Sequence, residues 1–187
     1  MKKIEIRESI KQDKAQLSQI DVSRLSLRML NRFSSLDFSS IKTIHTFLPI
    51  AEKKEPDTFV FIDWLGSHHP EIKIIVPKAD FDTALMANII YEGKETLVKS
   101  AFDILEPQKG ELHAGDVDLV LVPMLAFDKR GFRVGYGKGF YDRFLQGINT
   151  KKIGLCLFEP VETIDDVNEY DVKLNACITP RSFYRFD

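Results

Sequence analysis

The segment that most constrains the fold spans residues 120–145 and reads VLVPMLAFDKRGFRVGYGKGFYDRFL. It begins as an apolar run that ends at Pro123, passes through a polar loop, and reaches alternating glycines before a helix-like segment. An unbroken apolar run is typical of a parallel strand, because crossover helices cover both faces of such a sheet. A strand, a glycine loop and a helix start in succession can also hold an anion such as phosphate, since bare backbone N–H groups face the ligand.

The glycines are Gly135, Gly137 and Gly139, and two cations, Arg133 and Lys138, accompany them. Their spacing fits neither the GxxxxGK[ST] phosphate loop nor the GxGxxG dinucleotide motif. Glycine permits positive φ and a close approach of the backbone to a ligand. Lys138 would act as a point charge on a phosphate, whereas a guanidinium such as that of Arg133 grips two oxygens at once. We therefore favour anion binding over a flexible turn whose glycines serve geometry alone.

Asp142 directly follows the glycine loop and admits two interpretations. A carboxylate beside a bound phosphate is repelled unless a cation lies between them, which predicts Mg²⁺. A first-turn aspartate is also favoured by the helix dipole without any metal. An acidic loop downstream contains Asp165, Asp166, Glu169 and Asp171. One of these could provide a second ligand, although such loops are usually only solvated.

Apolar periodicity and turn residues predict the remaining elements. We expect helices over residues 4–18, 21–33, 59–65 and 141–146, with Asp21 capping the second and Asp57 or Thr58 the third. Strands are expected over residues 43–48, 72–76, 117–122, 153–158 and 176–179, loops over 51–56 and 105–115, and a hairpin of 85–91 with 96–99. The strand–helix–strand succession in the middle favours a parallel βαβ unit. We therefore predict a single α/β domain over residues 1–187, with a central, largely parallel sheet flanked by helices and with a hairpin excursion.

The composition excludes several classes of protein. The chain of 187 residues has a formal net charge of −2 and is 44% hydrophobic, which is typical of a globular domain and unlike a disordered segment. It lacks the basic excess of nucleic-acid-binding proteins. No apolar run approaches the length that spans a membrane, and the first residues lack the apolar core of a signal peptide. We expect a cytoplasmic protein that binds neither nucleic acid nor membranes.

The two cysteines, Cys156 and Cys177, both lie in apolar runs. We interpret them as buried, reduced thiols and not as a disulfide. The four histidines show none of the paired spacings of metal ligands, and His45 is expected to lie in the core or to line a crevice. Glu55 follows the first strand, at the edge where parallel strands build ligand crevices, although an ordinary surface glutamate would be the commoner case.

The segment FDKRGFRVGYGKGFYDRFL resembles the signature of the 5-formyltetrahydrofolate cyclo-ligase family, which reads roughly FDxxGxRxGxGxGxYD. The signature residues in place are Phe127, Asp128, Gly131, Arg133, Gly135, Gly137, Gly139, Tyr141 and Asp142. The resemblance extends to Lys3 and Arg7, to FLP at 47–49 with EPDT at 55–58, to VP at 76–77, LEP at 105–107 and DVK at 171–173. It covers essentially the whole chain.

The resemblance implies an α/β enzyme that uses ATP and Mg²⁺ to convert 5-formyltetrahydrofolate into 5,10-methenyltetrahydrofolate, releasing ADP and phosphate. Carried over by position, ATP would be bound by Lys3, Arg7, Arg133, Gly135, Tyr136, Gly137, Lys138, Gly139, Phe140 and Tyr141. Leu48, Glu55 and Tyr136 would contact the folate, which could carry a polyglutamate tail, and Asp142 and Asp171 would hold Mg²⁺. Lys138 and Arg133 would stabilise the transferring phosphoryl group, and no residue would be a covalent catalyst. We expect a monomer.

The chain departs from the family pattern at three points. Tyr136 stands where some relatives have Arg, so it could stack on a pterin or adenine ring and not contact phosphate. The loop after Leu48 is longer than in some relatives, which leaves Glu52 as an alternative to Glu55 for the folate-contacting carboxylate. Asn175 stands where an acidic residue is common.

Two other functions stay open from the sequence. One is a folate-binding protein that has kept the pocket without turnover, which tight folate binding without ADP release would reveal. The other is a different α/β enzyme with a phosphate ligand, such as a sugar-phosphate isomerase, which would be indifferent to ATP.

Overall fold

The strand β6 (Leu119–Pro123) lies at the centre of a seven-stranded sheet. The computed structural model describes residues 1–100 and 104–186 of the chain. The other strands are β1 (Thr43–His45), β2 (Lys73–Asp80), β3 (Leu85–Ile90), β9 (Lys151–Leu155), β10 (Ala176–Ile178) and β11 (Phe183–Arg185). Their order is β11-β10-β9-β6-β1-β2-β3, in which the five inner strands pair in parallel and β3 and β11 add antiparallel edges. The predicted α/β fold with a largely parallel sheet is confirmed, and β11 is an addition that the sequence did not reveal.

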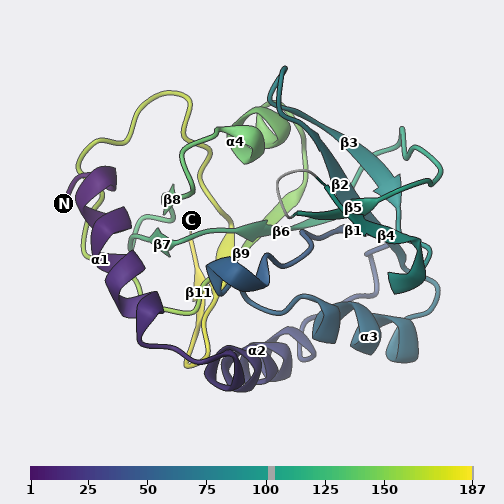
Figure 1. Ribbon diagram of the computed structural model, residues 1–187, viewed down its shortest axis with the longest axis horizontal. Coiled ribbons are helices and arrows are strands. Elements are labelled where there is room, and N and C mark those ends of the chain that lie inside the picture. The colour runs from purple at the N-terminus through teal and green to yellow at the C-terminus, as the bar shows by residue number, and fades with distance from the viewer. Residues whose placement is uncertain (101–103, 187) are drawn as a thin grey trace.

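Both faces of β6 are covered, as its apolar run predicts. Leu119 and Leu121 pack into one core with α2 (Gln19–Phe33) and α3 (Phe59–His68). Val120 and Val122 pack into a second core with α4 (Phe140–Leu145). Figure 1 shows α2 and α3 along one side of the sheet and α4 on the other. Because successive side chains of a strand point to opposite faces, an alternating sequence of two apolar sets fills both cores.

The first helix, α1 (Lys3–Ala15), brings the amino terminus to the glycine segment. It packs Ile6 and Ile10 against the small sheet formed by β7 (Ala126–Phe127) and β8 (Arg133–Val134). Figure 1 shows α1 beside β7 and β8, away from α2 and α3. Because the glycines follow β8 directly, this packing places α1 next to the glycine segment. Lys3 and Arg7 of α1 are predicted to bind ATP together with that segment.

Three helix boundaries differ from the prediction, of which the first is the end of α1 at Ala15 in place of residue 18. The cap of α2 is Ser18, whose hydroxyl accepts from the N–H of Asp21 while the Asp21 carboxylate accepts from the N–H of Ser18. Asp21 therefore completes a capping box and is not itself the cap. The helix α3 runs past Gly66 to His68, since an exposed helical glycine weakens a helix without ending it. The hydroxyl of Thr58 donates to the carbonyl of Phe47 at 2.6 Å and so fixes the segment after β1.

The hairpin lies earlier in the chain than predicted. Strand β2 continues through Pro77 to Asp80, and β3 pairs with it antiparallel. The Asp80 carboxylate accepts from the N–H groups of Asp82 and Thr83 and so closes the turn. The predicted pairing of residues 85–91 with 96–99 is wrong, because Gly93 leads into the 3₁₀ turn η2 (Lys94–Thr96) and not into a tight hairpin turn.

Short elements also replace two predicted loops. Strand β4 (Leu97–Lys99) pairs with β5 (Leu105–Pro107), which lies in a segment predicted to be loop. The 3₁₀ turn η1 (Ala51–Lys53) lies within the loop predicted over residues 51–56. These elements have only three residues each, which is too short for a repeating pattern of apolar residues to be recognised in the sequence.

The two cysteines are free and buried, as predicted. Burial raises the pKa of Cys156 to about 12 and that of Cys177 well above its usual value. Because the thiolate is the nucleophile, neither residue is reactive near neutral pH. Within the described residues no helix is long and apolar enough to cross a membrane.

Asp128 anchors the turn that precedes the glycine segment. Its fully buried carboxylate accepts from the backbone N–H groups of Arg130, Phe132 and Ile164 and from the Arg130 guanidinium. Hydrogen bonds to an ionised group are roughly twice as strong as those between neutral groups. One carboxylate therefore fixes the turn and ties it to the segment that follows β9.

Asp128→Asn is expected to lower the free energy of unfolding by about 2–3 kcal/mol, because an amide N–H₂ would replace an acceptor that several donors share. Urea denaturation measures the change. Glu162→Gln is the control, since it removes the same charge from a carboxylate that is 81% exposed and pairs with Lys129. That variant should cost less than about 1 kcal/mol. Similar losses in the two variants would show that the Asp128 network does not hold the turn.

Candidate functional site

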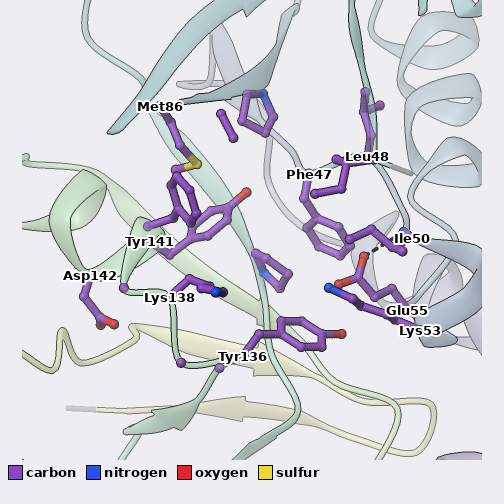
Figure 2. A pocket seen from close by; sticks show the side chains of 18 of the residues that line it. Phe47, Leu48, Ile50, Lys53, Glu55, Met86, Tyr136, Lys138, Tyr141 and Asp142 are labelled. Atoms are coloured by element: carbon purple, nitrogen blue, oxygen red, sulfur yellow. Dashed lines mark hydrogen bonds between the residues drawn. The ribbon is translucent and has the colours of Figure 1, made fainter. Parts of the chain in front are cut away.

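A cavity of about 310 Å³ opens at the carboxyl ends of β1 and β6. Strand β2 lies on one side of β1 and β6 on the other, so the cavity lies where the strand order reverses. Open α/β sheets bind ligands at such points. All the residues predicted to bind ATP, folate or metal line it: Lys3, Arg7, Leu48, Glu55, Arg133, Gly135, Tyr136, Gly137, Lys138, Gly139, Phe140, Tyr141, Asp142 and Asp171. Figure 2 shows many of their side chains converging from both sides of the cavity.

The glycine segment forms one wall of the cavity, and its conformation requires glycine at two positions. Gly137 has a φ of 86° and Gly139 a φ of 73°, both in the left-handed region that other residues rarely adopt. The guanidinium of Arg7 lies against Gly137 and donates from Nε to the carbonyl of Gly135 at 2.9 Å. The backbone can therefore turn its N–H groups toward the cavity, while α1 holds it from outside.

The two cations of this segment lie in different environments. Lys138 is exposed, and its ammonium group points into the cavity in Figure 2. Arg133 is only 6% exposed and donates to an Asp142 oxygen at 2.5 Å and to the Val172 carbonyl at 2.6 Å. Lys138 is thus open to the cavity, whereas Arg133 braces the start of α4. Because α4 has only six residues, its dipole adds little to this positive end.

The two carboxylates predicted to hold Mg²⁺ are each neutralised by a cation of the chain. Asp142 pairs with Arg133, and Asp171 accepts from the ammonium of Lys3 at 2.5 and 2.7 Å. The side chains of Lys3 and Asp171 are both 14% exposed, so little water screens the pair. Among the described residues, no group of three or more His, Cys, Asp or Glu side chains could by itself hold a metal.

The other acidic residues considered from the sequence lie outside the cavity. The Asp165 carboxylate contacts the amino group of Met1 at 2.6 Å, and that of Asp166 accepts from the Lys3 N–H at 2.8 Å. Both therefore fasten the amino terminus to the acidic loop. Asn175 is a structural residue, because its side-chain oxygen accepts from the N–H of Lys152 between β9 and β10.

The opposite end of the cavity is apolar and carries a single buried carboxylate. Phe47 and Leu48 line this end beside Glu55, whereas Met86 lies across the cavity near Tyr141. Glu55 is 5% exposed and accepts from the N–H of Ile50 at 2.8 Å. Burial raises the pKa of Glu55, and the Ile50 hydrogen bond together with nearby Tyr136 and lysines opposes that rise. Glu55 is therefore a buried carboxylate whose position in the cavity wall is fixed by a hydrogen bond.

Glu52, the alternative carboxylate, lies elsewhere. It is exposed and contacts the Lys99 ammonium at 3.4 Å. The geometry therefore favours Glu55 over Glu52 as the carboxylate that faces a ligand.

Tyr136 connects the two ends of the cavity. Its ring lies under the ammonium groups of Lys53, at 4.8 Å, and Lys14, at 5.7 Å. Its hydroxyl accepts from Lys14 at 3.4 Å and interacts with Glu55. The ring is therefore held by cations of the protein, on the side of the cavity that carries Glu55.

Several residues of the site carried no signal in the sequence. Lys14 and Lys53 read as ordinary surface lysines until α1 and η1 place them against Tyr136. Met86 and Phe81 reach the cavity because β3 pairs with β2, a pairing that the predicted hairpin missed. The ring of Phe81 contacts that of Phe140 at 5.3 Å, which joins the β2–β3 turn to the glycine segment.

Fold and site together define an α/β protein with a glycine loop and an apolar wall on opposite sides of one cavity, at the edge of the sheet where such proteins bind ligands. The chain matches the 5-formyltetrahydrofolate cyclo-ligase family over residues 1–180. It belongs to this family, which confirms the resemblance seen in the glycine segment.

Individual relatives agree with this membership. The 5-formyltetrahydrofolate cyclo-ligase of Mycoplasma pneumoniae is 30% identical over 185 residues, covering 95% of this chain and 98% of its own. That of Mycolicibacterium smegmatis is 30% identical over 148 residues, covering 75% and 74%. The solved structure of Aquifex aeolicus 5,10-methenyltetrahydrofolate synthetase superposes with a TM-score of 0.76 at 28% identity, covering 99% and 93%. The synthetase structure from Mycoplasma pneumoniae gives 0.73 at 26% identity, covering 95% and 98%.

His45 lies beneath the site and makes the stability of the fold depend on pH. It is fully buried, its ring packs at 4.7 Å from that of Phe144 and 6.0 Å from that of Tyr141, and burial lowers its pKa to about 3. Between this value and the ordinary value of 6.5, the unfolded chain binds a proton that the folded chain does not. Stability is therefore lost as the pH falls through that range.

His45→Phe removes this titration. Between about pH 7.5 and about pH 5, wild type should lose about 2 kcal/mol more unfolding free energy than the variant. Urea denaturation at both pH values measures the difference. Parallel pH curves for the two proteins would contradict the assignment of a neutral, buried histidine.

Proposed function

We propose that this chain converts 5-formyltetrahydrofolate to 5,10-methenyltetrahydrofolate with consumption of ATP, as the names and the family of its relatives suggest. The observation that carries the proposal is the convergence of the amino-terminal Lys3 and Arg7, the glycine segment, and Leu48 and Glu55 on one cavity. The test is the ATP-dependent rise in ultraviolet absorbance of the methenyl product with pure protein. Folate binding without ADP release would favour a binding protein, and indifference to ATP would favour another phosphate-ligand enzyme.

The glycine end of the cavity suits the triphosphate. Gly137 and Gly139 free the backbone N–H groups to face an anion, and Lys138 adds a mobile positive charge. Arg7 is already aligned by its bond to the Gly135 carbonyl. The residues predicted to bind ATP, folate and Mg²⁺ all line this one cavity, and we therefore propose that a single chain suffices for activity.

The apolar end suits the folate. Phe47 and Leu48 offer apolar surface to the fused ring, and Glu55 offers acceptors to its N–H groups. The ring of Tyr136 lies between the two ends. The reacting formyl group would then lie beside the glycine segment, next to the terminal phosphate.

The residues present fit Mg²⁺ that arrives together with the nucleotide. Mg²⁺ is usually held by one or two carboxylates, with phosphates and water completing its shell. Asp142 and Asp171 both line the cavity and would supply these carboxylates. The metal would neutralise charge on the phosphates. Lys3 and Arg133, which pair with the two carboxylates in the ligand-free protein, would then be available to phosphate oxygens.

The chemistry asks the protein for position and charge more than for a nucleophile. The formyl oxygen is a poor leaving group, so it takes the terminal phosphoryl group of ATP, and ADP leaves. N10 then attacks the formyl carbon and loses its proton, and the carbon–oxygen bond breaks to release inorganic phosphate. Lys138 stabilises charge on the transferring phosphoryl group, and the glycine N–H donors hold it in line. Neither buried thiol is used.

Lys138→Ala is expected to lower kcat by about 10²-fold or more, since it removes a charge aimed at the transferring group. The matched control is Lys129→Ala, which removes the same charge from an exposed lysine paired with Glu162 and should keep the wild-type rate. The absorbance assay measures both. A wild-type rate for Lys138→Ala would refute the phosphoryl role. Arg133→Ala is a weaker test, because its buried pair with Asp142 makes the variant lose stability as well.

Asp142→Asn is expected to raise the Mg²⁺ concentration that gives half-maximal activity about tenfold or more, because one of two carboxylates is lost. Asp165→Asn is the control, since that carboxylate contacts Met1 and lies outside the cavity. A magnesium titration at saturating ATP measures both variants. An unchanged titration for Asp142→Asn would show that Asp142 does not bind the metal and only pairs with Arg133 in the first turn of α4.

A further inference from the structure

Three segments that are distant in sequence meet at a buried lysine below the folate end of the cavity. Lys14, in the last turn of α1, is only 8% exposed. Its ammonium group donates to the carbonyl of Lys53 at 3.0 Å and to the hydroxyl of Tyr136 at 3.4 Å. A lysine rarely gives up its hydration unless polar partners compensate for it. The burial of Lys14 therefore requires an explanation.

The Tyr136 hydroxyl, which accepts from the Lys14 ammonium, also interacts with Glu55 and so links the buried lysine to a buried carboxylate. The Glu55 carboxylate is the strongest charged neighbour that offsets the effect of burial on the pKa of Lys14. Burial raises the pKa of Glu55 in turn, and the Ile50 N–H, the Tyr136 hydroxyl, Lys14 and Lys53 oppose this rise. Tyr141, from the start of α4, is the other titratable group that faces Glu55. Two buried groups of opposite charge thus stabilise each other's charged form.

The two lysines near Glu55 differ in the strength of their effect. Lys53 is exposed, so water screens its charge. Lys14 is buried and is fixed by two hydrogen bonds, so its charge acts through a medium of low dielectric constant. Its bond to Tyr136 also sets the position of the hydroxyl that interacts with Glu55.

We propose that Lys14 is a positioning residue that keeps Glu55 ionised and holds Tyr136 beside it, so that the cavity offers a charged acceptor to a heterocycle with adjacent N–H donors. One Glu55 oxygen is bonded to the Ile50 N–H, and a carboxylate has acceptor sites to spare for a ligand. A neutral Glu55 would present an O–H donor, which clashes with an N–H donor of the ligand. The recognition of the folate ring by Glu55 rests on the proposed function, whereas the charge state of Glu55 does not.

Lys14→Met tests the proposal, because methionine keeps most of the apolar stem and removes the charge. The matched control is Lys54→Met. Lys54 donates to the carbonyls of Lys14 and Ala15, so its loss removes an equal charge and a tie between the same two segments. A merely structural role for Lys14 would make the two variants behave alike.

The first measurement is the titration of the Glu55 carboxyl by NMR in ligand-free protein labelled with ¹³C-glutamate and assigned with Glu55→Gln. Loss of a cation near a carboxylate is expected to raise its pKa by about one unit or more in Lys14→Met. The pKa of Glu55 in Lys54→Met should equal that of wild type. Equal titration of Glu55 in all three folded proteins would overturn the proposal. If Lys14→Met does not fold, Lys14→Gln replaces it in the same measurement.

The second measurement is the affinity for 5-formyltetrahydrofolate without ATP, followed by calorimetry from about pH 5.5 to about pH 8.5. Lys14→Met should bind about tenfold more weakly than wild type at the acidic end and should recover as the pH rises and Glu55 ionises. Nucleotide affinity should stay within about twofold, since Glu55 lies at the other end of the cavity. A loss of folate affinity that is equal at every pH would contradict the role assigned to Lys14. If wild type itself does not bind the folate, the proposed function fails, and the NMR titration still decides the role of Lys14.

Discussion

The shape of the glycine segment depends on charged side chains that hold it from outside, because glycines have no side chains with which to pack. Asp128 fixes the turn before the segment through five donors, and Arg7 holds the Gly135 carbonyl from α1. Arg133 closes the far side by pairing with Asp142 at the start of α4. Because α1 packs on β7 and β8, Arg7 lies close enough to the glycine segment to make its contact.

The charges of the cavity are paired within the protein. Lys3 pairs with Asp171 and Arg133 with Asp142, so each carboxylate is balanced by a cation. Under the proposed function, a nucleotide with its metal brings both signs of charge together, and each ion pair can exchange its partner without leaving a buried charge alone. At the other end of the cavity, the Lys14 ammonium is bonded to the Tyr136 hydroxyl, which interacts with Glu55. Under the proposed function, the ion pairs near the glycine segment would therefore change partners when a ligand binds, whereas the contacts of Lys14 would stay the same.

The parts of the fold that depend on short, continuous stretches of sequence could be predicted from the sequence alone. The apolar run of β6 predicted a parallel sheet, and the signature through Asp142 predicted the family. Pairing between distant strands could not be predicted, because β3 could join β2 or β4 with similar patterns and only the long β2 strand decided between them. For the same reason Lys14 looked like any helix-end lysine, and the partners of Tyr136 were unknown. The roles of individual site residues remain predictions that the geometry makes consistent.

Under the proposed function, the terminal phosphoryl group of ATP is transferred to the formyl oxygen of the folate within this one cavity. Labelling that oxygen with ¹⁸O tests it directly, because the oxygen is absent from the methenyl product and must leave with either phosphate or water. Mass spectrometry of the inorganic phosphate formed in a single turnover gives the answer. The account predicts one ¹⁸O atom in each phosphate released. Unlabelled phosphate, with the ¹⁸O found in water, would contradict it.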